Sequence, residues 1–203
     1  MTTVSLKQVP LSVADQVCSC FYYIGCAAAD LEETVSKVAF AVFATLTAGV
    51  FLGRSEFLNG WVVFAWKDAF FAGRMLGQSL RGIIDPLGAY LEKVQLQKGN
   101  CINGFFNQKI ISSLTHAECT AGSLLFAGKG FAEISSISMS AFRMIGSLVL
   151  YVGSLGNAES MAVLAWSSCL SLVRSITVAG ACFYSAAAPR QAYLPLNVEY
   201  SSF

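Results

Sequence analysis

The residues that could carry catalytic chemistry are few in this sequence of 203 residues. It contains a single histidine, His116, so any Ser/His/Asp or Cys/His triad must include that ring. Glu118 does not share a helix face with His116, so its carboxylate cannot orient the His116 ring. His116 and Cys119 lie one helical turn apart, yet a closed zinc site needs four ligands and no second cluster supplies the others. The sequence therefore predicts a non-enzymatic protein without catalytic residues, metal or cofactor.

Three charged residues within apolar segments are candidates for a functional or structural role: Asp68, Arg74 and Arg174. Asp68 must pair inside a helical bundle if its segment enters a membrane. Arg74 and Arg174 occupy matching positions in two similar segments. Each could bind an anionic headgroup or a partner protein, or form an ion pair within the bundle.

The composition is unusually apolar. Hydrophobic residues make up 55% and charged residues 12% of the chain, against about 45–50% and about 25% in typical soluble domains. Such a surface can be kept from water by a bilayer, by an oligomeric interface or by complete burial. The net charge of +1 provides no basic patch, and this argues against nucleic-acid binding.

The seven cysteines are odd in number and irregularly spaced within apolar runs, which favours reduced thiols over a disulfide framework. They are Cys18, Cys20, Cys26, Cys101, Cys119, Cys169 and Cys182.

The chain contains two similar halves. Val63-Phe64-Ala65-Trp66 aligns with Val163-Leu164-Ala165-Trp166 at a separation of 100 residues, a register that also pairs Arg74 with Arg174. After a three-residue slip, Pro86 aligns with Pro189, each followed by x-x-Ala-Tyr-Leu. We interpret the pattern as a tandem duplication of one helical unit.

The sequence of each half predicts a helical hairpin. In the first, the segments 38–53 and 61–80 flank a turn at 54–60, and in the second the segments 135–153 and 161–184 flank a turn at 154–160. A separate helix is predicted at 17–29, with Asp30, Glu32 and Glu33 opening the next helix, where carboxylates suit the helix dipole. The predicted fold class is an all-α, internally duplicated bundle of helical hairpins.

The expected organisation follows from these elements. We predict a flexible leader at 1–10, a first helical unit at 11–99, a linker at 100–110, a second unit at 111–188 and an extended tail at 189–203. Folding the first hairpin about residue 57 brings Glu33 level with Arg81 and predicts an ion pair. The glycines expected to allow close helix packing are Gly49, Gly53, Gly73 and Gly77.

Membrane insertion is the favoured environment. A span needs about 20 apolar residues, and a central arginine costs about 2.5–3.5 kcal/mol, which a Leu/Phe/Val-rich helix can offset. The helix 61–80, with Lys67, Asp68 and Arg74, is harder to insert. Because lysines cluster near the N-terminus and in the connector, we predict cytoplasmic termini and connector, same-direction hairpins and both turns across the membrane.

The short Ser/Thr-containing leader, followed by closely spaced apolar hairpins over residues 1–80, resembles the type III-secreted inclusion-membrane proteins of chlamydiae. The resemblance is one of pattern and rests on no specific motif. It implies insertion in a host-derived membrane and a scaffolding role toward host or bacterial proteins.

The sequence thus favours a membrane-associated protein that binds or scaffolds, with the lipid bilayer and a protein partner or a second copy of itself as expected contacts. Two alternatives remain open. One is a soluble helical homo-oligomer, and the other is a small repeat-built transporter or channel in which Asp68, Arg74 and Arg174 are functional charges.

Overall fold

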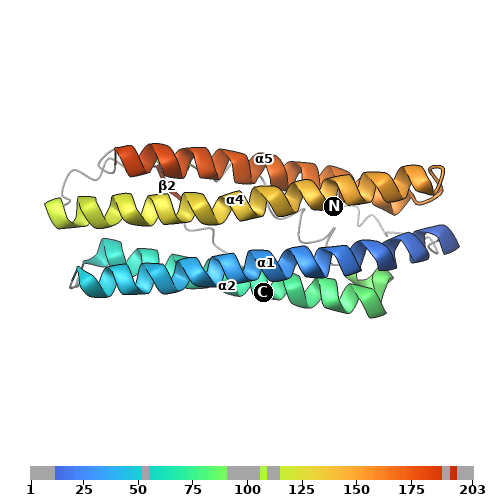
Figure 1. Ribbon diagram of the computed structural model, residues 1–203, viewed down its shortest axis with the longest axis horizontal. Coiled ribbons are helices and arrows are strands. Elements are labelled where there is room, and N and C mark those ends of the chain that lie inside the picture. The colour runs from blue at the N-terminus through green and yellow to red at the C-terminus, as the bar shows by residue number, and fades with distance from the viewer. Residues whose placement is uncertain (1–11, 52–54, 91–105, 109–114, 189–192, 196–203) are drawn as a thin grey trace, which may run out of the picture.

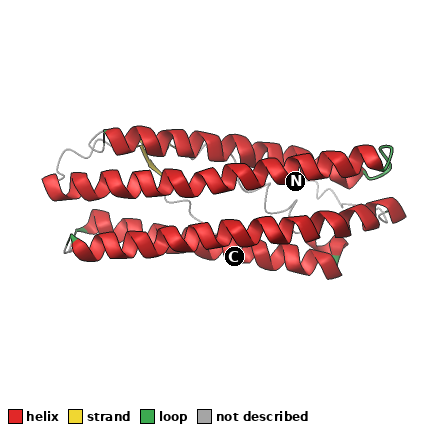
Figure 2. Cartoon of the chain, in the orientation of Figure 1, coloured by secondary structure: helices red, strands yellow, loops and turns green. Residues whose placement is uncertain are grey.

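A computed structural model describes residues 12–51, 55–90, 106–108, 115–188 and 193–195. Four long helices form two hairpins that lie side by side: α1 (Val13–Val50) with α2 (Glu56–Ile84), and α4 (His116–Gly153) with α5 (Glu159–Ala187) (Figure 1). Figure 2 shows that helices make up most of the described part of the chain. Two three-residue strands, β1 (Phe106–Gln108) and β2 (Tyr193–Pro195), pair antiparallel. The predicted all-α fold class is confirmed.

The first helix of each hairpin starts at a side-chain cap. Ser12 Oγ accepts a hydrogen bond from Asp15 N at 3.1 Å. At α4, Thr115 and Glu118 form a capping box, in which each side chain accepts from the other residue's backbone N–H. These caps satisfy N–H groups that have no partner within the helix.

Helix α1 is continuous, so the break predicted before Asp30 is wrong. Asp30 is buried in mid-helix, where it accepts hydrogen bonds from Arg143 and Ser79 instead of starting a helix. Helix α4 is likewise continuous and begins at His116, well before the segment predicted at 135–153. Helix α2 begins at Glu56, so most of the turn predicted at 54–60 is helical.

Every helix boundary of the first hairpin recurs in the second at a constant separation. Helices α1 and α4 both contain 38 residues, and α2 and α5 both contain 29. The starts of α1 and α4 give 116 − 13 = 103, and the ends of α2 and α5 give 187 − 84 = 103. The register of 100 predicted from Trp66 and Trp166 is three residues out. Three residues are almost one helical turn, so both registers place apolar side chains on similar faces.

The two hairpins pack in opposite directions, with α1 antiparallel to α4 (Figure 1). Ser12 Oγ, at the start of α1, donates to the carbonyl oxygen of Asn157 in the turn after α4, at 3.2 Å. At the other end of the bundle, Ser55 Oγ, just before α2, donates to the Glu118 carboxylate in the first turn of α4. The start of each hairpin therefore touches the turn of the other.

These contacts have the pattern of an approximate two-fold axis. Midway along the bundle, Ser136 Oγ donates to Glu33 Oε1 at 2.8 Å, and these residues are equivalent positions, 103 apart. Contact between equivalent positions marks such an axis. The two hydrophobic cores obey the same relation. One core includes Leu58, Trp61, Leu125 and Phe126, and the other includes the equivalent Met161, Leu164, Tyr22 and Tyr23.

The antiparallel packing contradicts the predicted same-direction topology. The turn between α1 and α2 lies at one end of the bundle and the turn between α4 and α5 at the other (Figure 1). Residue 90, after the first hairpin, and residue 115, before the second, consequently lie at opposite ends of the bundle. Residues 12 and 188 also lie at opposite ends. The prediction assumed that both hairpins enter a membrane from one side, whereas direct contacts between the hairpins fix their direction in this structure.

The parts of the chain predicted as a leader (1–10), and most of the linker (100–110) and tail (189–203), lie outside the described residues. Within the linker and tail, strands β1 and β2 are described, and Phe106 pairs with Pro195 and Gln108 with Tyr193.

Of the four glycines predicted to allow close helix packing, Gly49, Gly73 and Gly77 are described, and none of these three marks a close approach. Gly49 and Gly77 are exposed, and a Cβ at either would meet no atom within 4 Å. At Gly73 an added Cβ would lie 4.0 Å from the Thr34 methyl group, an ordinary contact. Gly53 lies outside the described residues. Other glycines mark close approaches, among them Gly82, where a Cβ would lie 2.5–2.8 Å from ring atoms of Tyr23.

We predict opposite effects for two glycine substitutions in α2. Gly82→Ala should destabilise the protein by about 1–3 kcal/mol, because the added methyl group overlaps the Tyr23 ring. Gly77→Ala should stabilise it by about 0.5–1 kcal/mol, because alanine favours the helix and space is open. Thermal unfolding of both variants under one condition measures the difference. Equal effects would contradict the packing of α1 on α2.

The antiparallel arrangement predicts which engineered cysteines can be bridged. In a background lacking the native cysteines, Ser12→Cys should cross-link to Asn157→Cys through a short bifunctional maleimide. The matched pair of Ser12→Cys with Thr115→Cys should not cross-link, because these residues lie at opposite ends. Gel mobility reports the intramolecular product, and the reverse pattern would mean that the hairpins run in the same direction.

Candidate functional site

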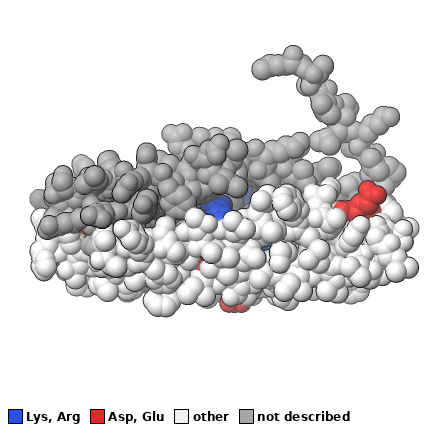
Figure 3. Space-filling view, turned by 90° about the horizontal axis from the view of Figure 1, so that it is seen from above, with Lys and Arg blue, Asp and Glu red and all other residues white. Residues whose placement is uncertain are grey.

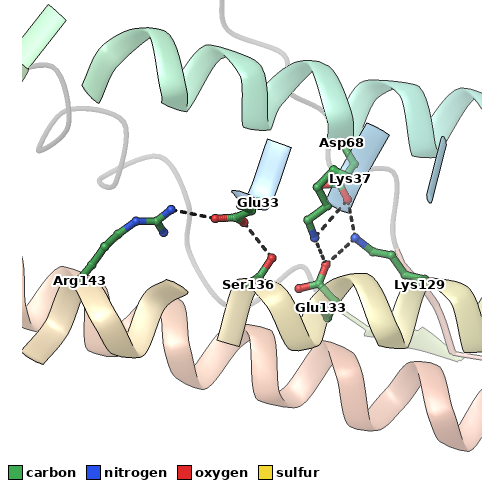
Figure 4. A network of polar contacts seen from close by, with 7 residues as sticks. All are labelled: Glu33, Lys37, Asp68, Lys129, Glu133, Ser136 and Arg143. Atoms are coloured by element: carbon green, nitrogen blue, oxygen red, sulfur yellow. Dashed lines mark hydrogen bonds and ion pairs between the residues drawn. The ribbon is translucent and has the colours of Figure 1, made fainter. Parts of the chain in front are cut away.

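The most distinctive chemistry of the bundle is a row of charged side chains along the interface between the hairpins (Figure 4). They project inward from α1, α2 and α4, and Lys129 and Asp68 lie among residues of the first hydrophobic core. The row contains two groups, which we call the charged tetrad and the Arg143 cluster. The tetrad consists of Lys37, Asp68, Lys129 and Glu133.

The charged tetrad alternates cations and anions in a closed ring. Glu133 Oε1 lies 2.5 Å from both Lys37 Nζ and Lys129 Nζ. Asp68 Oδ2 lies 2.5 Å from Lys129 Nζ and 3.4 Å from Lys37 Nζ. The ammonium group of Lys129 also lies 5.3 Å from the ring centre of Phe64, within cation–π range. Three helices meet in this one neutral group.

The Arg143 cluster lies further along the same interface. The Arg143 guanidinium from α4 donates to Asp30 and, at 2.9 Å, to Glu33, both on α1. Ser79 from α2 donates to Asp30, and Ser136 from α4 donates to Glu33. With one cation and two carboxylates, the cluster carries one excess negative charge when all its groups are ionised.

These ion pairs are buried, so separating their members has a large energetic cost. The side chains of Lys37 and Lys129 are 4% and 3% exposed, and that of Glu133 is 9% exposed. A buried ion left without its partner costs several kcal/mol, whereas a complete pair roughly offsets its own desolvation. The row therefore adds little net stability, but it strongly penalises any arrangement of the hairpins in which the charges do not meet.

A further polar contact closes the bundle at the start of α1. The buried Asp15 carboxylate accepts hydrogen bonds from Ser160 N at 3.2 Å and from Ser160 Oγ at 2.8 Å. Asp15 thereby satisfies a backbone donor in the first turn of α5. Its equivalent, Glu118, makes a similar contact with Ser55 at the opposite end.

The structure places the predicted site residues in different environments. Asp68 pairs inside the bundle, as its insertion would require. Arg74 and Arg174 are half-buried. At the separation of 103 that relates the helix boundaries, Arg174 corresponds to Phe71 and not to Arg74.

The Glu33–Arg81 pair expected from folding the hairpin about residue 57 stays a prediction. Glu33 binds Arg143, and Arg81 Nη2 lies 3.7 Å from Asp85 Oδ2 on an exposed surface. Ser79 contacts Asp30, which places Arg81 nearer the start of α1 than Glu33.

Most of the charged residues of this network were not predicted as site residues. The missed residues are Asp30, Lys37, Lys129, Glu133 and Arg143. A signal was present, because Asp30, Glu33 and Lys37 recur at three- and four-residue spacing and Lys129 precedes Glu133 by four, which places each set on one helix face. Which helix those faces meet depends on the antiparallel packing and could not be inferred locally.

The outside of the bundle is apolar. Leu46, Phe131 and Trp166 are 63%, 66% and 66% exposed and belong to three different helices. On the face drawn in Figure 3, the described surface carries very little charge. Helices α1, α4 and α5 are long and apolar enough to cross a membrane, whereas α2 is not among the helices of the described chain that meet this criterion.

Metal-binding groups do not gather in the described part of the chain, where no cluster contains three or more His, Cys, Asp or Glu side chains suited to an ion. The six described cysteines form no disulfide with one another.

We predict that breaking the charged tetrad is more damaging than removing it. Glu133→Gln should lower the free energy of unfolding by about 3–5 kcal/mol, because it leaves two buried ammonium groups with one carboxylate. Replacing all four residues (Lys37→Met, Asp68→Leu, Lys129→Met and Glu133→Leu) should restore stability to the wild-type level or above it.

The matched control for Glu133→Gln is Glu32→Gln on the exposed side of α1, which should change stability by no more than about 0.5 kcal/mol. Denaturant unfolding followed by circular dichroism measures all three proteins. A Glu133→Gln effect as small as that of Glu32→Gln would show that the tetrad does not hold the hairpins together.

Comparison with protein-family models, with curated proteins and with solved structures finds no match for this chain. What can be inferred about function therefore rests on its own geometry. Two features of that geometry are informative, namely the paired charges inside and the apolar side chains outside.

Proposed function

We propose that the protein is a non-enzymatic, membrane-associated helical protein that acts by binding or scaffolding other components. The observation that carries the proposal is that the bundle buries charged side chains while large apolar side chains remain exposed on its outside. Charged side chains such as Lys37, Lys129 and Glu133 lie inside, and large apolar side chains cover the outside. In a protein surrounded by water the opposite arrangement is usual, with Lys and Glu almost never fully buried unless paired.

The lipid bilayer accounts for both parts of this distribution. Apolar side chains on the outside lose nothing in contact with lipid tails. Ionisable residues within membrane segments normally face the bundle interior and pair with one another, as Asp68 and Lys129 do at 2.5 Å. Association with a partner protein or a second copy would use the same apolar exterior.

The charged tetrad supports the proposed scaffolding role. Its charges are engaged with one another, and they hold three helices in one arrangement instead of presenting a reactive group. A stable apolar framework of this kind suits the display of loops and helix ends to partners.

A soluble homo-oligomer is the second candidate, and two observations favour it. Antiparallel hairpins require the segment between residues 90 and 115 to pass from one end of the bundle to the other, which in a bilayer means crossing the hydrocarbon. Glu32 and Lys67 are also exposed halfway along α1 and α2. In an oligomer, neither feature has a cost.

A transporter is the third candidate. Oppositely directed halves related by an approximate two-fold axis, with charges near the middle, also occur in secondary transporters. On this reading Arg174→Leu abolishes uptake or causes a leak, whereas a scaffold tolerates that substitution.

We expect the protein to remain in the membrane pellet when membranes from expressing cells are washed with alkaline carbonate, and to be released by detergent. The reason is that its apolar exterior, not surface charge, would hold it there. Immunoblotting of pellet and supernatant measures the partition. A known peripheral protein in the same membranes provides the control.

Release by carbonate, with a single discrete oligomer on size-exclusion chromatography, would falsify the membrane proposal and support the soluble oligomer. For inserted protein, maleimide labelling of Leu155→Cys and Ser55→Cys from one side distinguishes the topologies. Labelling of only one of the two turns agrees with antiparallel hairpins, and labelling of both means that the hairpins insert in the same direction.

A further inference from the structure

A groove opens between α1 and α4 next to the Arg143 cluster. Its volume is about 320 Å³, at the lower end of the roughly 300–1,000 Å³ range of small-molecule sites. Tyr22 and Cys26 form part of its buried floor. Its rim consists of four exposed apolar side chains: Phe21, Phe142, Ile145 and Val149. We call it the Gly146 groove, after the small residue that lines it.

The approximate two-fold axis explains why this groove exists. The equivalents of Gly25, Arg143 and Gly146 in the other half are Gly128, Phe40 and Phe43. There the two phenylalanines fill the space, since a Cβ on Gly128 would lie 2.9 Å from the Phe43 ring and 3.3 Å from the Phe40 ring. In the Gly146 groove the first phenylalanine is replaced by an arginine that binds carboxylates, and the second by glycine.

The occupied half thus shows which chemistry fits the vacant half. Apolar side chains fill the equivalent space, and apolar side chains line the groove apart from Arg143. The groove opens toward the outside of the bundle, where the surface is apolar. An extended hydrocarbon chain entering from that side matches both the lining and the opening.

Arg143 adds a polar requirement at the groove. Its Nε is buried and has no hydrogen-bond acceptor among the described residues, although its Nη2 binds Asp30 and Glu33. A buried donor without an acceptor is costly, so a ligand that brings an oxygen acceptor is favoured. Because the adjoining carboxylates already outnumber the single cation, that acceptor should be neutral.

We propose that the Gly146 groove binds one acyl chain of an esterified membrane lipid, with an ester carbonyl oxygen accepting a hydrogen bond from Arg143 Nε. The choice of a membrane lipid as the source of the chain rests on the proposed membrane association. The carbonyl requirement rests on the Arg143 contacts alone.

The test uses the full-length protein purified in detergent and a phosphatidylcholine probe with a photoactivatable diazirine in one acyl chain. After irradiation, mass spectrometry of peptides should locate adducts at Phe21, Ile145 or Val149. Excess unlabelled diester phosphatidylcholine should suppress these adducts. The diether analogue, which lacks carbonyl groups, should compete about tenfold less well, a ratio equivalent to about 1.4 kcal/mol. Equal competition by ester and ether would overturn the carbonyl contact.

Two substitutions test the groove by filling it in one half of the bundle and opening the equivalent space in the other half. Gly146→Phe inserts the side chain that fills the equivalent site, and space is available because a Cβ there meets nothing within 4 Å. It should abolish the groove adducts. Phe43→Ala should open a second groove and add adducts near Gly128. Gly153→Phe, also in open space on α4, is the matched control and should label like the wild type.

Adducts that persist in Gly146→Phe at wild-type intensity, with unchanged circular dichroism, would overturn the groove as the binding site. Micelle labelling needs no bilayer insertion, so its outcome is separate from the carbonate experiment. Specific labelling of a protein that carbonate releases would leave the lipid site standing and remove the membrane proposal. Carbonate-resistant protein without specific labelling would do the reverse.

Discussion

The arrangement of this protein depends on the sharing of one carboxylate oxygen of Glu133 by the ammonium groups of Lys37 and Lys129. The interfaces around it are built largely from small side chains, such as Ala41 and Ala65 in the first hairpin and Ser140 and Ser168 in the second. Small residues let helices approach closely. A shift of one helical turn between the hairpins would separate buried charges from their partners at a cost of several kcal/mol each. The tetrad therefore penalises such a shift.

The same interior charges constrain the surroundings of the bundle. A chain with so few charged residues cannot both pair them inside and cover its outside with them. The outside is left with side chains such as Phe131 and Trp166, which are stable in contact with lipid or with another protein surface. Helices of 38 residues are about 57 Å long, almost twice the roughly 30 Å hydrocarbon thickness. If α1 and α4 enter a bilayer, they must tilt strongly or extend well beyond it.

Local sequence patterns predicted the positions of the helices better than the contacts and directions of the helices relative to one another. Apolar periodicity and the second turn near Gly156 identified two helical hairpins, and the compositional bias correctly indicated helices apolar enough for a membrane. The carboxylates at Asp30 and Glu33 were assigned to a helix start because that is where local physics favours them, whereas a distant arginine determines their actual role. The predicted duplication agrees with the matching helix lengths, and the separation of 103 between Pro86 and Pro189 is that of the helix boundaries, whereas the separation of 100 between Trp66 and Trp166 differs by three residues because side chains nearly one turn apart share a face. Hairpin direction left no local trace, since it depends on contacts such as Asp15 with Ser160 across 145 residues.

The contact between Glu33 and Ser136 has a consequence for how such a bundle can arise. A residue on a two-fold axis meets its own copy in any dimer of identical hairpins, so a glutamate there would face a second glutamate in the apolar interior. Joining two hairpins in one chain removes that identity requirement. One copy can then keep the carboxylate while the other supplies a hydroxyl donor, and the same freedom allows Phe43 to fill a space that Gly146 leaves open. A covalently linked pair can evolve an asymmetric interior that no homodimer of its halves could encode.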